Sequence, residues 1–152
     1  MPGEIPRRGL GAASVIVDAG AHVLLVRHTY GQLNWELPGG AAEARESAEE
    51  TARREAREEV GVDIVIERFI GVYWDPAWRE GQGAHHFVFR ARLSDGAPPP
   101  AVRDTNEISD CAWFPTDGLP RPISDFTVRR IADALADRPA GVWTIPPRTW
   151  LR

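Results

Sequence analysis

The chain has 152 residues and a formal net charge of -4, with 43% hydrophobic and 26% charged residues. This composition is typical of a globular protein, and the length suits a single domain over residues 1–152. Because binding to a nucleic-acid backbone normally requires a basic face, the acidic balance argues against polymeric nucleic acid as a partner. No stretch approaches the roughly 20 apolar residues that a membrane-spanning helix needs.

The N-terminal segment and the cysteine content give no sign of export. Residues 1–10 lack an apolar run that precedes a small-residue cleavage site. Cys111 is the single cysteine, so an internal disulfide cannot form and nothing indicates an oxidising compartment. We interpret Cys111 as a small buried residue of a short strand rather than as a nucleophile. We therefore expect a soluble, cytoplasmic protein.

The first part of the chain predicts three strands. Residues 13–17 and 22–27 are apolar runs, and the turn signal Asp18–Ala19–Gly20 between them predicts a hairpin. Residues 35–37 form a short third strand, which Pro38–Gly39–Gly40 ends.

A helix is predicted from Ala48 to Val60, with sequence signals at both ends. Ser47 can accept a hydrogen bond from the first turn, and Glu50, three residues on, can reach back to complete a capping box. Gly61 suits the left-handed residue that commonly follows the last turn of a helix.

The second half of the chain predicts three more strands and one helix. The strands are expected at residues 62–74, 84–93 and 111–114, and the helix starts near Ser124. The first ten residues and the tail from about residue 139 look irregular. This order of elements predicts an α+β or mixed α/β fold in which a mixed sheet lies between helices.

The helix of residues 48–60 carries an acidic flank. Glu55, Glu58 and Glu59 are spaced i, i+3, i+4 and therefore share one side, with Glu59 nearest the buried stripe and Glu58 farthest from it. Arg54 can neutralise part of this charge, and a divalent cation would neutralise more. Carboxylate oxygens without nearby His or Cys suit Mg²⁺ or Mn²⁺ better than zinc. The alternative is a solvated helix face with i, i+4 ion pairs. The stripe that faces the sheet consists of Ala48, Ala52, Ala56 and Val60.

Residues 40–62, GAAEARESAEETARREAREEVGV, resemble the Nudix box, G-x5-E-x7-R-E-U-x-E-E-x-G-U with U apolar. The preceding Trp35–Glu36–Leu37–Pro38–Gly39 is similar to the usual lead-in of that family. Arg45 departs from the many members that have glycine at this position. The resemblance implies a Nudix-type α/β/α sandwich and a hydrolase of diphosphate linkages. The matching positions are Gly40, Glu46, Arg54, Glu55, Ala56, Glu58, Glu59, Gly61 and Val62.

The resemblance also implies a role for each matching residue. Glu55, Glu58 and Glu59, with the backbone carbonyl of Gly39, would bind Mg²⁺ or Mn²⁺. Arg54 would orient these carboxylates by charge-assisted hydrogen bonds, and Glu46 would belong to the same network. A water molecule would then attack one phosphorus atom and expel the other half of the substrate as a phosphate.

The base that accepts the proton of this water varies within the family. It is either a glutamate of the box, with Glu58 or Glu59 as first choices, or a residue of a later loop. Asp104, Glu107 and Asp110 are available there, and Glu107 is our candidate.

The substrate-binding residues follow less directly from the sequence. Arg27 ends an apolar strand and would either meet a substrate phosphate or lie on the surface. Tyr73 and Trp74, near Trp78, would stack on a base or belong to a core or a dimer interface. Pro76, 14 residues past the box, is similar to a proline of ADP-ribose-cleaving relatives.

The sequence is consistent with three kinds of protein. The first is a hydrolase of nucleoside diphosphates linked to another moiety, with ADP-ribose or a nucleotide sugar favoured as the small substrate. The second is a nucleoside triphosphate pyrophosphohydrolase that removes damaged nucleotides. The third is a Nudix-like binding module without activity, against which the intact acidic residues of the box argue. The C-terminal Trp143 and Trp150 would pack on the domain or on a second subunit, which leaves a homodimer open.

Overall fold

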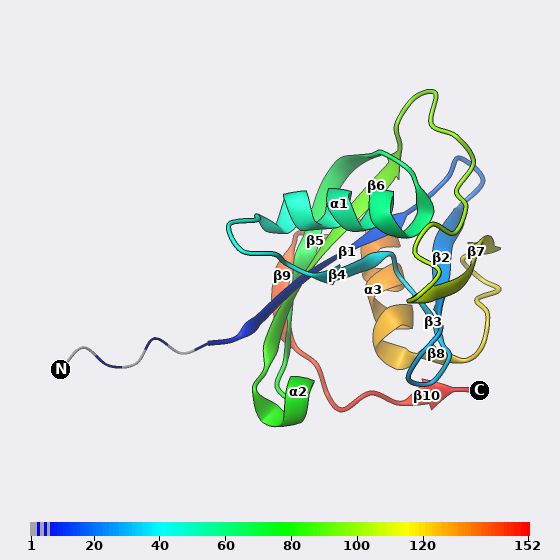
Figure 1. Cartoon of the computed structure of the whole chain (residues 1–152). Helices are drawn as coiled ribbons and strands as arrows, with labels where there is room; N and C mark the ends of the chain where they lie inside the picture. The colour runs from blue at the N-terminus through cyan, green and yellow to red at the C-terminus, as the bar shows by residue number, and fades with distance from the viewer. Residues whose placement is uncertain (1–2, 4, 6) are drawn as a thin grey trace.

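The computed structural model describes residues 3, 5 and 7–152, and part of the expected irregular N-terminus, at residues 1, 2, 4 and 6, lies outside them. The fold is mixed α+β, as predicted, but it contains two five-stranded mixed sheets instead of one. Helix α1 (Ala48–Val60) covers one side of the sheets and helix α3 (Asp125–Leu135) the other (Figure 1).

The first sheet carries the strand that approaches α1. Its order is β4-β1-β6-β5-β9, with β1 parallel to β6 and antiparallel to β4. The short α2 (Trp78–Gly81) is a turn between β5 and β6, with Arg79 and Glu80 in left-handed conformations. The bounds are β1 Gly9–Ile16, β4 Gly39–Ala41, β5 Ile64–Asp75, β6 Ala84–Leu93 and β9 Gly141–Thr144.

The second sheet has the order β10-β8-β3-β2-β7. Here β2 pairs antiparallel with β3 and β7, while β3 and β8 run parallel. Cys111 is half-buried on β7, in agreement with its predicted place on a short strand. The bounds are β2 His22–His28, β3 Trp35–Glu36, β7 Ile108–Pro115, β8 Ile123–Ser124 and β10 Trp150–Leu151.

The predicted hairpin between the first two strands is wrong. The turn itself forms, because the Asp18 carboxylate accepts hydrogen bonds from the backbone N–H groups of Gly20 at 2.9 Å and His22 at 2.8 Å. Only one isolated bridge, Val17 to Val23, follows it. β1 and β2 then diverge into different sheets, since each finds longer partners, β6 and β7, far away in the sequence.

The predicted irregular C-terminal tail is also wrong in two places. β9 adds a parallel strand beside β5, and β10 pairs with β8. Ile145, between them, is buried in the core. These short segments carry little strand signal of their own, and partners that are distant in the sequence order them.

Both faces of the central strands are buried. Val15 of β1 and Val17, just beyond its end, face the core that includes Phe126 and Ile131 of α3, whereas Ile16 packs towards Ala56 of α1. A strand that is covered on both faces reads as a continuous apolar run, which explains the sequence of β1. The helices are thereby fixed on opposite sides, and α1 lies beside β1 and β4.

Ser47 and Gly61 cap the two ends of α1 as predicted, but among the described residues the Glu50 side chain makes no hydrogen bond back to the Ser47 N–H, so only half of the predicted capping box forms. The Ser47 hydroxyl accepts a hydrogen bond from the Glu50 backbone N–H at 3.1 Å. Gly61 is left-handed, with φ of 70°, and its N–H bonds to the Arg57 carbonyl. Just before the helix, Arg45 is also left-handed, with φ of 66°, a conformation that favours glycine, the residue that the resemblance to the Nudix box implies here.

Replacing Arg45 by glycine should therefore stabilise the protein. We expect Arg45→Gly to raise the free energy of unfolding by about 1 kcal/mol, because a side chain with a Cβ atom is strained at positive φ. Urea denaturation measures the change. Arg45→Ala is the matched control, since it removes the arginine but keeps the Cβ atom. An equal gain in both variants would show that backbone strain at residue 45 is not the cause.

Candidate active site

The site begins where the backbone of β4 passes between β1 and α1. A methyl group at Gly39 would collide with the Ala12 carbonyl oxygen, and one at Gly40 would lie 2.6 Å from Oε1 of Glu55. The two glycines therefore let the main chain lie directly against β1 on one side and against a carboxylate of α1 on the other. A side chain at residue 39 would therefore clash with the backbone of β1, and one at residue 40 would displace the Glu55 carboxylate.

The helical pitch distributes the acidic side chains of α1 as the sequence predicts. Ala52, Ala56 and Val60 are buried on the stripe that faces the sheet. Glu59 is 3% exposed, next to this stripe. The side chain of Glu55 is 12% exposed, and that of Glu58 is 53% exposed. The acidic flank thus runs from the buried interior to solvent.

Arg54 is the centre of an ion-pair network. Its Nη1 donates to Glu55 Oε1 and Glu58 Oε2, each at 3.0 Å. Its Nε and Nη2 donate to the two oxygens of Glu46, and Nη2 also donates to the Ala41 carbonyl. All five N–H groups of the guanidinium are in use, so Arg54 joins β4, the loop before α1 and two glutamates of the helix.

Glu46 is held as an anion by this network. Its carboxylate accepts hydrogen bonds from Arg54 and, at 2.7 Å, from the Thr51 hydroxyl. These bonds lower the pKa of Glu46 from 4.5 to about 2. The structure therefore brings Glu46 into the network expected for it.

Glu59 is placed very differently. Its Oε2 atom is buried and has no hydrogen-bond partner among the described residues. Burial, and then the nearby charge of Glu55, raise the pKa of Glu59 from 4.5 to about 10, although a backbone hydrogen bond from Gly39 acts in the opposite direction. Burial likewise raises the pKa of Glu55, with Arg54 opposing it. A buried carboxyl group without a partner, beside a second one, would be stabilised as an anion by a cation.

The later loop brings Glu107 towards the same side. The Glu107 carbonyl accepts a hydrogen bond from the Thr29 backbone N–H at 2.9 Å, and the Asp104 side chain caps the turn by accepting from the Glu107 N–H at 3.3 Å. The charge of Glu107 adds to the rise in the pKa of Glu59. Asp110 instead accepts from the Cys111 N–H at 2.8 Å, so it serves its own strand.

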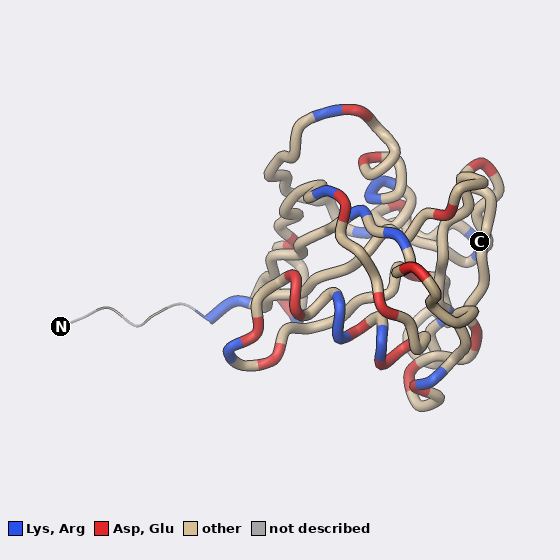
Figure 2. The backbone as a smooth tube through the Cα atoms, turned by 90° about the horizontal axis from the view of Figure 1, so that it is seen from above, with Lys and Arg blue, Asp and Glu red and all other residues tan. Residues whose placement is uncertain are grey.

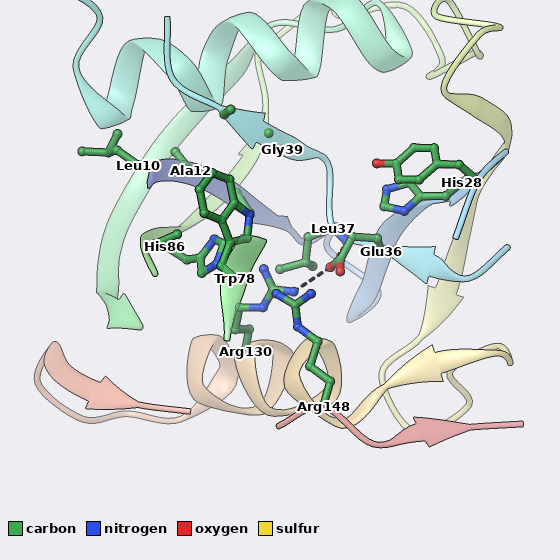
Figure 3. Close-up of a pocket in the computed structure, with 16 residues that line it drawn as sticks. Leu10, Ala12, His28, Glu36, Leu37, Gly39, Trp78, His86, Arg130 and Arg148 are labelled. Atoms are coloured by element: carbon green, nitrogen blue, oxygen red, sulfur yellow. Dashed lines mark hydrogen bonds and ion pairs between the residues drawn. The ribbon is translucent and has the colours of Figure 1, made fainter. Parts of the chain in front are cut away.

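A cavity of about 210 Å³ opens beside Gly39 and Gly40. Figure 3 shows Trp78 and His86 at one end, His28 at the other, and Glu36 with Arg130 between them. The walls near Gly39 are apolar, with Leu37 and Ala12, and the opposite side is charged. The cavity therefore combines apolar surface with a few fixed polar groups, as small-molecule sites do.

A buried ion pair forms the charged side of this cavity. Glu36 Oε1 accepts hydrogen bonds from Arg130 Nη2 at 2.7 Å, from the Thr127 hydroxyl at 2.8 Å and from the Leu37 N–H at 2.8 Å. Burial alone would raise the pKa of Glu36, but Arg130 and the hydrogen bonds outweigh it and hold the pKa below 4.5. Glu36 is therefore a fixed acceptor and Arg130 a fixed donor.

His86 and Arg148 extend this polar side. Arg148 Nη2 donates to Asp75 Oδ2 at 3.0 Å. Burial, and then the charges of Arg130 and Arg148, lower the pKa of His86 to about 4. The imidazole is therefore neutral near pH 7.

The predicted substrate-binding residues do not line the cavity. Tyr73 is fully buried in the core, where its hydroxyl donates to Asp133 at 2.6 Å, so the prediction that it stacks on a base is wrong. Trp74 packs on His85, with ring centroids 4.7 Å apart. Arg27 donates from Nε to the Leu33 carbonyl at 3.0 Å. Trp143, half-buried, packs on Tyr73 of the same chain.

Most of the residues that line the cavity were not predicted from the sequence. Of the aromatic group at residues 73–78, only Trp78 reaches the cavity, because the turn α2 carries it back over β1. Strand alternation could have separated Tyr73 from Trp74, but not Trp78, which lies beyond the strand. Arg130 and Arg148 come from distant parts of the chain, and no local pattern marks them.

Comparison with known proteins agrees with this architecture. The NUDIX domain matches residues 7–135. The chain is 32% identical over 124 residues to a putative 8-oxo-dGTP diphosphatase of Bacillus subtilis (strain 168), covering 76% of this chain and 78% of that one. It is 28% identical over 130 residues to a MutT-like protein of Streptomyces ambofaciens, covering 86% and 79%.

Solved structures show the same fold. A MutT NUDIX hydrolase from Burkholderia pseudomallei superposes with a TM-score of 0.71 at 26% identity, over 84% of this chain and 98% of that chain. A UDP-X diphosphatase superposes with a TM-score of 0.74 at 23% identity, over 93% and 69%.

The chain therefore belongs to the Nudix family. It is a hydrolase of the pyrophosphohydrolase type, and the family acts on small nucleotide-derived substrates. Within the part of the chain that the structure describes, no helix is both long and apolar enough to cross a membrane.

Nudix hydrolases generally use divalent metal ions, and the residues present fit one. The fit rests on the buried oxygen of Glu59 that lacks a partner, next to Glu55 and Gly39. Across residues 3, 5 and 7–152, no three His, Cys, Asp or Glu side chains form a ready-made metal-binding group. Instead Glu55 and Glu58 share Arg54, so a bound cation would compete with Arg54 for these two carboxylates.

The raised pKa of Glu59 predicts a pH dependence of stability without divalent cations. The folded state keeps the Glu59 proton up to about pH 10, whereas the unfolded chain releases it near 4.5. The contribution of Glu59 to the free energy of unfolding is therefore fully present below pH 4.5 and is lost as the pH rises towards 10. Glu59→Gln removes this loss and should stabilise the protein at about pH 8 by up to about 5 kcal/mol.

Urea denaturation in EDTA from about pH 5 to about pH 9 measures this difference. Glu50→Gln is the matched control, since Glu50 is exposed on the same helix. Parallel pH profiles for wild type and Glu59→Gln would contradict the expectation.

Proposed function

We propose that the protein hydrolyses the diphosphate linkage of a nucleoside diphosphate joined to another moiety, such as ADP-ribose or a nucleotide sugar, with Mg²⁺ or Mn²⁺. The observation that carries the proposal is the cavity directly beside the acidic flank of α1. The glycines of β4 form the boundary between the two, so one substrate can place a ring group in the cavity and its phosphates at the carboxylates.

The size and lining of the cavity suit one ring group. About 210 Å³ is less than the roughly 300–1,000 Å³ of sites that enclose a whole drug-sized ligand. Trp78 offers an aromatic face, while Glu36 and Arg130 offer an acceptor and a donor side by side. A nucleobase presents donors and acceptors on its edge and a flat face for stacking. The rest of the substrate would extend past Gly39 towards solvent.

The charges around α1 favour a diphosphate that ends in an uncharged group. The three arginines of α1 are already engaged: Arg54 in its network, Arg53 with the Ile64 carbonyl and Arg57 with Asp63. A terminal phosphate of a triphosphate would bring further negative charge to this acidic flank. A sugar would bring none.

The chain would contribute to hydrolysis in three ways. Glu55, Glu58 and Glu59 would hold the divalent ion, which when bound supplies Lewis-acid polarisation of phosphate oxygens. Arg54 keeps Glu55 and Glu58 on the same side of α1. Glu107 would accept the proton of the attacking water, because it is exposed on that side and its carboxylate is not needed by the network of Arg54.

A second candidate is a nucleoside triphosphate pyrophosphohydrolase. It is favoured by the 32% identity to the putative 8-oxo-dGTP diphosphatase of Bacillus subtilis. The cavity would hold a nucleobase in either case, so only the group beyond the diphosphate separates the two candidates.

We also propose that the protein is cytoplasmic and that it forms a homodimer. Light scattering during size-exclusion chromatography would test the dimer. Trp143 is half-buried and packs on Tyr73 of its own chain, which agrees with its expected packing on the domain.

A substrate screen decides between the two enzyme candidates. We expect the wild-type protein with Mg²⁺ to convert a nucleoside diphosphate sugar or ADP-ribose into a nucleoside monophosphate and a sugar phosphate. Chromatography identifies both products. Release of pyrophosphate from triphosphates, with no turnover of diphosphate sugars, would establish the second candidate.

Two substitutions separate ion binding from proton transfer. Glu59→Gln should reduce Mg²⁺-dependent turnover to background while the protein stays folded, because the buried site loses an anionic ligand. Glu107→Gln should lower kcat by about 10²- to 10⁴-fold and leave Mg²⁺ binding intact, as expected for a general base. Steady-state kinetics and calorimetric Mg²⁺ titration check both, with Glu50→Gln as the control. Near-normal turnover of Glu59→Gln would contradict the assignment of the site.

A further inference from the structure

The mouth of the cavity carries two stacked rings that the chemistry described above does not use. His28 and Tyr30 both line the cavity, and their ring centroids lie 4.6 Å apart with an angle of 13° between the planes. His28 covers one face of the Tyr30 ring. Tyr30 is nevertheless 53% exposed, so much of its ring is open at the mouth. We call this pair the His28–Tyr30 platform.

The platform lies at the opposite end of the cavity from Trp78. Figure 3 shows His28 on one side of Glu36 and Leu37, and Trp78 with His86 on the other. The cavity thus has an aromatic surface at each end and the glycines of β4 between the ends.

The surroundings of Tyr30 place the platform close to the proposed site of hydrolysis. After burial, the charges that raise the pKa of the Tyr30 phenol are those of Glu107, Glu59, Glu36 and Glu55, in decreasing order. Glu107, Glu59 and Glu55 belong to the proposed active site, and Glu36 lines the cavity. A group that stacks on Tyr30 would therefore be attached close to the phosphorus that is cleaved.

The loop that bears Tyr30 is held in place by hydrogen bonds on both sides. The Thr29 hydroxyl donates to the Asn106 carbonyl at 2.6 Å, and the Thr29 N–H donates to the Glu107 carbonyl at 2.9 Å. The His28 N–H donates to the Asn34 carbonyl at 2.9 Å. The platform is therefore formed before any ligand binds, which lowers the entropy that binding must overcome.

We propose that the His28–Tyr30 platform binds a second ring of the substrate, on the far side of the diphosphate from the ring held beside Trp78. The inference rests on the proposed function and narrows it to substrates with a ring on both sides of the diphosphate. The faces of aromatic rings are electron-rich, so they attract a base or the C–H groups of a sugar. They offer no stabilisation to a terminal phosphate, which is itself negative.

Kinetics of Tyr30 variants test this proposal. Tyr30→Leu removes the aromatic face and should raise KM for ADP-ribose or a nucleotide sugar about tenfold, which corresponds to ~1.4 kcal/mol and to the strength of one stacked ring. The KM for a nucleoside triphosphate should stay within about twofold of wild type, because that substrate has no second ring. Tyr30→Phe keeps the face and should behave as wild type. Leu33→Ala is the matched control, since Leu33 is exposed in the same loop and does not line the cavity.

Each outcome decides for or against the platform. A penalty confined to two-ring substrates supports it. An equal penalty on triphosphates, or no penalty on either class, overturns it. If the wild type cleaves only triphosphates, the proposed function fails, and calorimetric titration of the metal-free protein with a nucleotide sugar decides the platform separately. The platform would then be supported if Tyr30→Leu binds the nucleotide sugar about tenfold more weakly than wild type and Tyr30→Phe binds it equally well. Equal affinities of wild type and Tyr30→Leu would refute it.

Discussion

The close approach of α1 to the backbone of β4 is the constraint on which the site depends. Gly39 lies directly against β1 and Gly40 directly against the Glu55 carboxylate, so the acidic flank of α1 lies just across β4 from the cavity that these glycines line. The same contact removes Glu59 from water and leaves one of its oxygens without a partner in the described structure. The geometry that brings the carboxylates to the cavity therefore also makes the ion-free protein less stable.

Local physical chemistry explains why α1 and its charges could be predicted from the sequence. Ser47 and Gly61 act within one turn of the helix, and the exposure of Glu55, Glu58 and Glu59 follows from helical pitch alone. The cavity could not be predicted in this way. Its lining comes from β1, β2, β3, β4, β6, α2, α3 and the C-terminal segment, which only the long-range pairing of strands brings together.

The wrong predictions share this cause. The turn at Asp18 has the chemistry of a hairpin, but β1 gains more by pairing along its full length with β6. In the sequence, Tyr73 and Trp74 look equally suited to bind a ligand. In the structure, α3 covers one face of β5, so Tyr73, which points to that face, is buried, and Trp74, which points to the other face, is half-exposed.

The site divides into two parts with different electrostatic balance. On the cavity side, Glu36 and Arg130 neutralise each other and are satisfied by hydrogen bonds, so this part is rigid without any ligand. On the α1 side, the carboxylates outnumber Arg54, and the excess charge remains for a cation. Ion binding and ring recognition are thus separable: substitutions in the cavity can change which group is held while the acidic helix stays as it is. Because Tyr30 and Glu107 are tied through Thr29, the mouth of the cavity is the place where the two parts are mechanically linked.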